Sequence, residues 1–369
     1  MGFSYLEFAA QVEKVSVLAK LAAIVYRTGW IARIANEGTY YPEKKRKGKA
    51  RRILDLAVWS WKYGETHESY NVYGQDVSGA DMYAYCDYMN TYMRNRKRMN
   101  SVDQPYTMTG ILGDKLQFYH FCREAGIPTP EVFAFYRNNQ LYDPDMRRID
   151  LEEIREYKDY FIKDPYGFGG RFVEHIDDSE ELQRKMLQLS QRDFIFQKRI
   201  EQCEEENRLY AGSINTLRIV TINPAAAGEA EEPYVLAKLQ RTGSSFSGNV
   251  DNWDSGGFGI GIQDNGYLKE YGIRKYYYGG KTDTHPDTGI RFSEYKVPML
   301  EESIALCLEA HSKLYSLHSV GWDVALTKEG PMLIEGNENW DIRLAQACDR
   351  PLRQDWLKSF KKQNNIKEE

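Results

Sequence analysis

The sequence has few of the residues that build metal–thiolate or disulfide frameworks. Its five cysteines are spread along 369 residues, and no two of them form a CxxC pair. The odd number and the wide spacing exclude a disulfide scaffold and favour reduced thiols in a cytoplasm. The most apolar stretch, Val15–Tyr26, is interrupted by Lys20 and is too short to span about 30 Å of hydrocarbon. No signal peptide is predicted, because Glu7 and Glu13 precede this stretch and no small-residue cleavage site follows.

Two common nucleotide-binding motifs are also missing. The chain contains no GxxxxGK[ST] loop and no GxGxxG that opens a helix, so neither a P-loop nor a dinucleotide-binding fold is indicated. Hydrophobic residues make up 42% and charged residues 28%, which excludes collagen-like, low-complexity and wholly disordered chains. The length predicts two or three packed units.

Charge is distributed unevenly. Residues 1–105 hold 16 Lys+Arg and 11 Asp+Glu, a net +5, whereas the whole chain has a net charge of −5 and the remainder therefore −10. Because most of the chain is negatively charged, it lacks the continuous basic surface that binds nucleic acid, and we expect no nucleic-acid partner. Seven basic residues lie within Lys44–Arg52. This tract is either a solvated loop or a contact for anionic lipid or an acidic glycan carrier.

The pattern of apolar residues changes near Asp103. Helical spacing dominates before it, with helices expected over Ile53–Tyr63 and Met82–Met99. After it, helices alternate with short strand-like segments such as Val132–Tyr136 and Leu217–Ile222. This order favours an α+β architecture with several small sheets.

The strongest chemical signal is a predicted hairpin over residues 321–337. Asp323 begins one strand, and Glu335 and Asn337 end the next, so their side chains are expected to meet on one face. Two carboxylates and an amide oxygen form the hard, oxygen-only ligand set that Mg²⁺ accepts. The alternative is a pair of surface strands with scattered acids, but both carboxylates are embedded in apolar sequence, where unpaired charge is rare.

A second signal is a strand that delivers Lys163 into the glycine-rich turn Gly167-Phe-Gly169-Gly170. Glycine lets the backbone approach a polyphosphate closely, and the lysine supplies a positive charge, although a plain tight turn would have the same sequence. A third is Phe194–Ile200, an apolar strand end followed by an acidic cluster. It is read either as a hinge against an adenine edge or as an edge strand that enters a loop.

Together these motifs resemble those of the ATP-grasp ligases, and in particular the sugar-transfer-associated branch, over roughly residues 105–345. The resemblance also rests on Gly113-Asp-Lys115 leading into a helix, on Ser213-Ile-Asn-Thr-Leu-Arg218, on Asn249–Gly257 and on His285–Gly289. Helical spacing predicts a helical N-terminal region at residues 1–104, and the resemblance implies an ATP-grasp domain at residues 105–369, with a lid subdomain at about 130–200. ATP would lie between two α+β subdomains.

The resemblance assigns roles residue by residue. Nucleotide contacts are implied for Lys115, for Lys163 with the turn at Gly167, Gly169 and Gly170, and, on the adenine side, for Gln197, Lys198 and Ile200. Magnesium ligands, for two ions with Glu335 bridging, are implied for Asp323, Glu335 and Asn337. Family chemistry activates a carboxylate as an acyl phosphate, which an amine or another nucleophile then attacks.

The acceptor carboxylate needs a cation, and arginine suits bidentate contact. Arg218 is the first candidate and Arg241 the second, with Arg343 also considered; structural salt bridges are the alternative for each. Related ligases often have an arginine at the position of Gly321, so Arg218 or Arg241 is expected to steady the transferred phosphoryl oxygens in its place.

The sequence therefore predicts an ATP- and Mg²⁺-dependent ligase that joins a carboxylate to an amine or sugar-linked substrate, in surface polysaccharide or related small-molecule biosynthesis. The alternatives are a phosphotransferase that uses the same ATP site and a non-catalytic nucleotide-binding scaffold. The expected location is cytoplasmic, with possible membrane contact through Lys44–Arg52. The sequence gives no indication of the oligomeric state.

Overall fold

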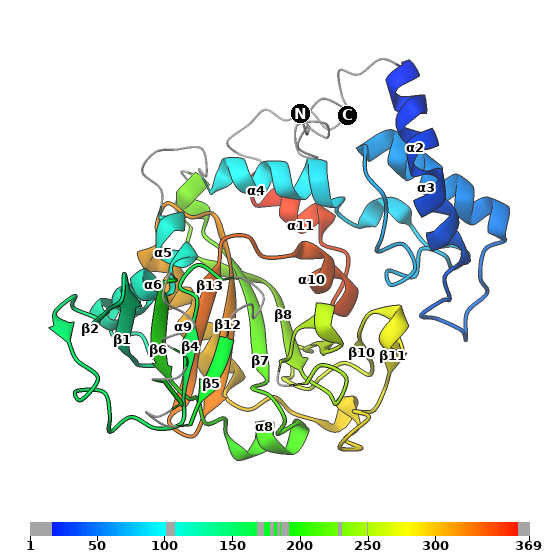
Figure 1. The fold of residues 1–369 in the computed structure, drawn as a ribbon. Coiled ribbons are helices and arrows are strands. Elements are labelled where there is room, and N and C mark those ends of the chain that lie inside the picture. Colours follow the sequence, from blue (N-terminus) through cyan, green and yellow to red (C-terminus); the bar gives the residue numbers. More distant parts are fainter. Residues whose placement is uncertain are drawn as a thin grey trace.

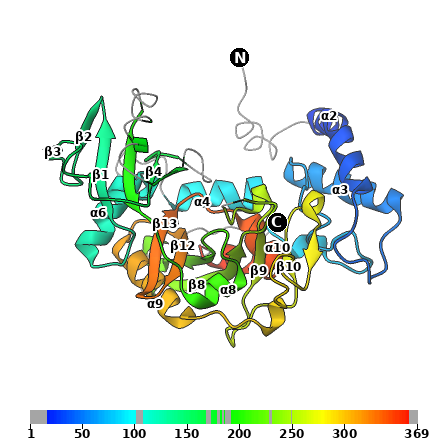
Figure 2. The same ribbon diagram turned by 60° about the horizontal axis from the view of Figure 1, so that its bottom comes forward.

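The computed structural model describes residues 17–100, 108–167, 173–177, 181–182, 185, 192–227, 231–248 and 250–360. These residues form two antiparallel sheets and a group of N-terminal helices (Figure 1). The smaller sheet lies on one side of the larger sheet, and helices α2 (Val17–Asn36) and α3 (Lys49–Tyr63) lie on the other (Figures 1 and 2). Gly169 and Gly170 of the predicted phosphate-binding turn lie outside the described residues.

The larger sheet has seven strands in the order β11-β10-β9-β8-β7-β12-β13, and every neighbouring pair is antiparallel. The prediction of several small sheets was wrong, because segments distant in the sequence, such as β7 and β12, pair directly. The strands are β7 (Thr216–Ile222), β8 (Tyr234–Thr242), β9 (Phe258–Gly261), β10 (Gly272–Ile273), β11 (Lys281–Thr282), β12 (Ser319–Thr327) and β13 (Gly330–Asn337).

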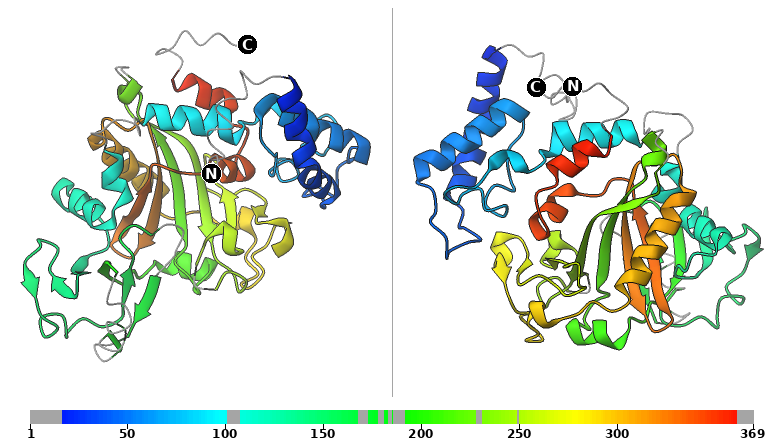
Figure 3. Two further views of the ribbon diagram at one scale, coloured as in Figure 1. Left: turned by 45° about the horizontal axis from the view of Figure 1, so that its top comes forward. Right: turned by 180° about the vertical axis from the view of Figure 1, so that it is seen from behind.

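Both faces of the larger sheet are buried. On β7, Leu217 and Ile219 belong to one apolar core, whereas Val220 and Ile222 belong to the other. Burial on both faces explains why this strand reads as a nearly continuous apolar run. Helix α9 (Leu300–Lys313) covers the first face, as the view from behind shows (Figure 3), and α10 (Ile342–Cys348) and α11 (Arg353–Lys358) contribute to the second core.

The smaller sheet is also antiparallel, with six strands in the order β3-β2-β1-β6-β4-β5. Two helices, α5 (Thr109–Gly113) and α6 (Lys115–Ala125), precede it, and α8 (Glu204–Leu209) follows it. Asp114 caps α6 by accepting from the backbone N–H groups of Leu116 and Gln117, at 2.8 and 3.2 Å. The strands are β1 (Val132–Arg137), β2 (Gln140–Tyr142), β3 (Arg148–Ile149), β4 (Tyr160–Lys163), β5 (Val173–Ile176) and β6 (Phe194–Lys198).

The expected helix over Met82–Met99 is interrupted. The structure has a 3₁₀ turn, then a π-helical segment and then α4 (Arg94–Met99). Asp87 causes the restart, because its carboxylate accepts from the backbone N–H groups of Asn90 and Thr91, both at 2.9 Å. The short helical turns of the chain are Met82–Ala84, Tyr88–Met93, Pro224–Ala227, Trp253–Ser255, Tyr276–Tyr278 and Phe292–Glu294.

Buried polar groups attach the N-terminal region to the larger sheet. Asn100 Oδ1 accepts from the backbone N–H groups of His318 and Ser319, both at 3.0 Å, next to the start of β12. Gln346 of α10 accepts from Cys86 N at 2.7 Å and donates to Cys86 O at 3.2 Å. The position of the domain boundary at residue 104 and the extent of the lid stay predictions.

Intramolecular ion pairs occupy part of the basic tract Lys44–Arg52. Arg46 Nε lies 2.7 Å from Asp76 Oδ2, Lys47 Nζ lies 2.8 Å from Asp55 Oδ2, and Arg52 is buried. Lipid contact through this tract stays a prediction, now limited to its exposed side chains. Among the described helices, none is both long enough and apolar enough to cross a bilayer.

Candidate functional site

Two carboxylates lie side by side at the centre of the site. Asp323 on β12 pairs directly with Glu335 on β13, and their carboxyl groups share a hydrogen bond. Asn337, two residues further along β13 and therefore on the same face, donates from Nδ2 to Glu335 Oε1 at 3.1 Å. The structure thus brings together the three residues predicted to bind magnesium.

Two arginines converge on Asp323. Arg218 is the residue of β7 that pairs with Asp323, and its Nε and Nη2 atoms lie 2.5 and 3.0 Å from the two carboxylate oxygens. Arg241 of β8 donates from Nη1 to Asp323 Oδ2 at 3.1 Å and from Nη2 to Asp251 Oδ1 at 2.5 Å. Asp251 in turn accepts a hydrogen bond from Thr216.

The two central carboxylates have opposite pKa shifts. Burial alone would raise the pKa of Asp323, but Arg218 and Arg241 outweigh this effect and lower it to about 2. Burial raises the pKa of Glu335, and the neighbouring charge of Asp323 raises it further. Such a pair needs a proton or a cation between its members. A magnesium ion would meet this need, because the side chains of Asp323, Glu335 and Asn337 offer it oxygen ligands.

Arg218 also occupies the space beside Gly321, where related ligases often carry an arginine. A Cβ atom built on Gly321 would lie 2.5 Å from Trp340 Cβ and 3.5 Å from Arg218 Cδ. Trp340 therefore leaves no room for a side chain at Gly321. The guanidinium group beside Asp323 comes from the adjacent strand instead.

The two predicted phosphate-binding lysines belong to the smaller sheet, which is called the lid sheet below, and to helix α6 that precedes it. Lys163, at the end of β4, donates to Gln197 Oε1 at 2.6 Å, and burial lowers the pKa of Lys163 to about 8. Lys115, at the start of α6, donates to Gly167 O at 2.5 Å, and burial lowers its pKa as well. The nearby Glu335 carboxylate opposes this lowering of the pKa in both lysines, so its electrostatic field reaches both ammonium groups.

The remaining residues of the predicted adenine side lie at the end of β6. Gln197 Nε2 donates to Pro130 O at 3.4 Å, in addition to its contact with Lys163. Lys198 is directed to the surface, where its Nζ atom lies 2.5 Å from Glu131 Oε2. Ile200 is half-buried beyond the strand. Gly167 ends the described part of the turn, and Gly169 and Gly170 lie outside it.

A cavity of about 850 Å³ opens in front of the carboxylate–arginine cluster. The larger sheet contributes the five residues already described, Arg218, Arg241, Asp323, Glu335 and Asn337. The opposite wall comes from the N-terminal region and includes Trp30, Arg33, Glu37, Tyr40 and Glu68. Of the described residues, neither Lys115 nor Lys163 lines this cavity.

Arg343, the third arginine considered, lies apart from Asp323. Its Nη2 atom is 2.7 Å from Asp341 Oδ2, and its guanidinium group stacks over Tyr88 at 4.2 Å from the ring centroid. It lines the cavity between the sheet and the N-terminal region.

Two features of the site were not singled out from the sequence. Asp251 was named only as part of the Asn249–Gly257 motif. The N-terminal wall of the cavity was missed, because no local sequence pattern marks contacts with residues about 200 positions away.

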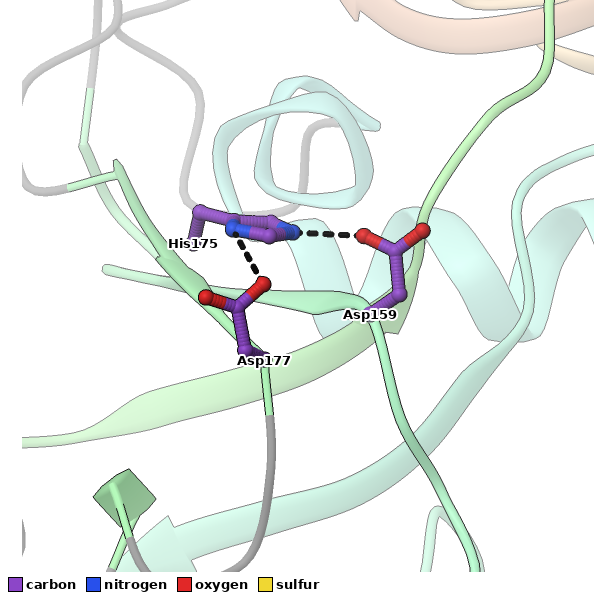
Figure 4. A group of neighbouring side chains, drawn as sticks. All are labelled: Asp159, His175 and Asp177. Atoms are coloured by element: carbon purple, nitrogen blue, oxygen red, sulfur yellow. Dashed lines mark hydrogen bonds and ion pairs between the residues drawn. The ribbon is translucent and has the colours of Figure 1, made fainter.

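A second group of potential metal ligands lies on the lid sheet (Figure 4). His175 Nε2 is 2.6 Å from Asp159 Oδ1, and His175 Nδ1 is 3.4 Å from Asp177 Oδ1. Arg199 also pairs with Asp159, at 3.1 Å. These side chains are exposed or half-buried, and their contacts with one another and with Arg199 account for the group without a metal ion.

A family model described as sugar-transfer associated ATP-grasp matches residues 94–362. The chain belongs to this family. The match covers well over half of the sequence and confirms the family and the fold expected from the motifs. No curated protein matches the sequence. Residues 17–93, which hold α2, α3 and most of the far cavity wall, lie outside the match.

Two solved ATP-grasp ligases are similar to this chain over part of its length, at low sequence identity. The ligase PsnB with its minimal precursor is 16% identical over 68% of this chain and 62% of the PsnB chain, with a TM-score of 0.38. The chain thus spans less than two thirds of the length of PsnB. D-alanine–D-alanine ligase from Bacillus anthracis is 14% identical over 73% of this chain and 74% of that chain, with a TM-score of 0.42.

Proposed function

We propose that this ATP-grasp protein is an ATP-dependent ligase that activates a carboxylate as an acyl phosphate and joins it to an amine. The observation that supports this most directly is the arrangement around Glu335. A paired, oxygen-rich cluster lies within the field of two lysines and opens into a separate cavity. Phosphoryl transfer requires mainly positioning and charge stabilisation, and these groups supply both.

The lysines and the lid would hold the nucleotide. Lys115 and Lys163 would supply positive charge for the phosphate oxygens. Gln197, Lys198 and Ile200 would contact the adenine side. In this arrangement Gln197 also orients Lys163, because their side chains are 2.6 Å apart.

Asp323, Glu335 and Asn337 would hold magnesium, for which we propose two ions. Bound magnesium would neutralise charge on the transferred phosphoryl group and on the leaving ADP. The chain's own contribution is to keep two carboxylates together, which Arg218 and Arg241 make possible by holding Asp323 ionised.

The reaction would proceed in two transfers. An oxygen of the acceptor carboxylate attacks the γ-phosphorus of ATP, the bond from that phosphorus to the β–γ bridging oxygen breaks, and ADP leaves. The amine nitrogen then attacks the acyl carbon, and the carbon–oxygen bond to phosphate breaks. The ammonium form of the amine loses two protons in all, one to the leaving phosphate and one to solvent. Arg218 and Arg241, beyond their contacts with Asp323 and Asp251, would orient the acceptor carboxylate.

The acceptor would be a small carboxylated molecule such as a sugar acid, in surface polysaccharide or related biosynthesis. Aromatic and amide side chains line the cavity, among them Trp253, Tyr276, Asn252 and Asn339, and such side chains suit a polar ring. A reducing, cytoplasmic location is proposed from the five buried free cysteines.

The test is to trap the activated carboxylate. The protein is incubated with ATP, Mg²⁺, hydroxylamine and a panel that includes D-glucuronate, D-galacturonate and amino acids. A hydroxamate formed together with ADP supports the proposal. A stable phosphate ester that resists hydroxylamine would show a phosphotransferase, and nucleotide binding without turnover would show a scaffold.

A matched pair of variants links this activity to the carboxylate cluster. Glu335→Gln removes one ligand charge and should lower turnover by about two orders of magnitude or more. Glu329→Gln makes the same change at an exposed position in the turn of the same hairpin and should leave turnover unchanged. Wild-type rates in Glu335→Gln, with its fold confirmed by circular dichroism, contradict the metal assignment.

A further inference from the structure

The two N-terminal helices expose far more apolar surface than the rest of the described chain. Of the 19 large apolar side chains that are exposed in the described residues, nine lie on α2 and α3. All the exposed leucines and isoleucines of the described residues are among these nine. Both helices lie at the outer edge of the molecule in every view (Figures 1, 2 and 3). Apolar side chains gathered on a surface in this way mark a contact with another molecule.

Helix α2 is apolar on two sides, and only one of them is packed against the protein. Ile31 lies in the core that α2 forms with α3. Leu18, Leu21 and Val25 follow one another at intervals of three and four positions and share another side of the helix, where they are 77%, 48% and 69% exposed. A Cβ atom built on Gly29, one turn after Val25, would meet no atom within 4 Å. Because a helix that is apolar all round is normally buried, this outward side of α2 needs a cover that the described residues do not supply.

Helix α3 adds apolar side chains next to α2. Leu54 and Val58, one turn apart, are both exposed. The two helices are in contact through their shared core and through Lys20 of α2, whose Nζ atom lies 5.6 Å from the centroid of the Trp61 ring of α3. The exposed apolar side chains of the pair therefore belong to one part of the molecular surface.

The charge of this part of the chain is strongly positive. Residues 17–62 hold 11 Lys+Arg and three Asp+Glu, a net +8, and α2 contains no acidic residue. Asp55, the acid of α3, is buried, with its carboxylate 2.8 Å from Lys47 Nζ. Lys45 and Lys49 are exposed. The molecule that covers the apolar side chains should thus carry negative charge around an apolar interior.

We propose that the outward sides of α2 and α3 dock on an anionic lipid bilayer. The apolar side chains would enter the headgroup region, and the exposed lysines would lie against acidic headgroups. A second copy of this chain is disfavoured as the partner, because two surfaces that each carry a net +8 repel one another.

This contact differs from adsorption through the basic tract Lys44–Arg52 alone, since the apolar side of α2 carries it. It does not depend on the ligase reaction proposed above. Because α2 also supplies Trp30 and Arg33 to the wall of the acceptor cavity, docking would hold that wall near the bilayer surface.

The first test measures vesicle binding by flotation of the full-length protein. Vesicles of phosphatidylcholine that contain about one third phosphatidylserine should bind the wild type at least about tenfold more tightly than vesicles of phosphatidylcholine alone. Leu18→Ser combined with Val25→Ser removes two apolar side chains from the outward side of α2 and should weaken binding by about tenfold or more. Tyr315→Ser, at a 68% exposed position beyond α9, is the control and should bind as the wild type does.

A second pair of variants tests the charge. Lys45→Glu combined with Lys49→Glu should weaken binding by about 25-fold or more, because each basic side chain near an anionic leaflet contributes a factor of about five. Lys158→Glu combined with Lys328→Glu makes the same change in net charge at exposed positions on the far side of the larger sheet and should leave binding nearly unchanged. Circular dichroism checks that each variant is folded.

Three results would overturn the proposal. The first is a wild type that does not bind the vesicles that contain phosphatidylserine. The second is binding that survives in a folded Leu18→Ser/Val25→Ser protein, which would show adsorption through the basic tract alone. The third is a dimer, detected by light scattering, that becomes a monomer in Leu18→Ser/Val25→Ser and would show a second copy on this surface.

Discussion

The titration of Lys163 offers a direct test of the nucleotide site. Its half-buried ammonium group lies at the end of β4 against Gln197, and burial lowers its pKa to about 8. An unperturbed lysine titrates near pH 10.4, so this side chain loses its charge in a range where proteins are readily studied. Because a neutral amine interacts with phosphate oxygens far more weakly than an ammonium does, nucleotide affinity should fall as the pH rises above about 8.

The size of the effect follows from the fraction of the protein that carries the charge. One pH unit above a pKa of about 8, roughly one molecule in ten has a charged Lys163, so the apparent dissociation constant should rise about tenfold between pH 7 and pH 9. A hydrogen bond to a charged group is worth about 1.5–3 kcal/mol, which sets the maximal loss at about 10- to 150-fold.

The assay is calorimetric binding of a non-hydrolysable ATP analogue with Mg²⁺ between about pH 7.5 and 9.5, above the range in which the γ-phosphate itself titrates. Lys163→Arg should remove the dependence on pH, because a guanidinium group stays charged throughout. Lys238→Arg, on β8 and paired with Asp264 at 3.0 Å, is the control and should keep it. A flat profile in the wild type, or a retained slope in Lys163→Arg, would refute the assignment.

Further predictions concern the cluster and the N-terminal attachment. Arg218→Lys keeps the charge but loses the bidentate contact with Asp323, and it should lower kcat by about 100-fold while melting experiments show a folded protein. Asn100→Ala leaves two buried backbone N–H groups without their acceptor and should lower the free energy of unfolding by about 1–3 kcal/mol, measured with urea. Removal of divalent cations with EDTA should weaken binding of the ATP analogue. Because the pKa of Glu335 is raised, this carboxyl group takes up a proton as the pH falls, so Mg²⁺ affinity, measured by calorimetry, should decrease toward acidic pH.

The central hairpin was the part most accessible to sequence reasoning. Asp323 and Glu335 are separated by a single short turn, so the two-residue period of the strands is enough to place them on one face. The capping signal of Asp87 is equally local, and attention to it would have divided the expected helix over residues 82–99 correctly.

Other features depend on contacts that no local pattern encodes. Arg218 meets Asp323 across 105 positions, and the choice between Arg218 and Arg241 could not be made without knowing that β7 lies between β8 and β12. The wall formed by Trp30 and Glu68 depends on how a whole region packs against the sheet. Sequence periodicity identifies which residues are buried within an element, whereas partners this distant are determined only by the assembled fold.

The N-terminal region and the lid sheet, which lie on opposite sides of the larger sheet, are attached to it by different kinds of contact. Buried groups such as Asn100 and Gln346 bind the N-terminal region to β12 and α10, so the acceptor cavity forms one body with the carboxylate cluster. The segment before the lid sheet is linked to the hairpin through exposed Pro128 and half-buried Thr129: buried Leu333 donates from its N–H to Pro128 O, and its carbonyl accepts from the Thr129 hydroxyl. Closure on a nucleotide should therefore move the lid and leave the acceptor walls in place.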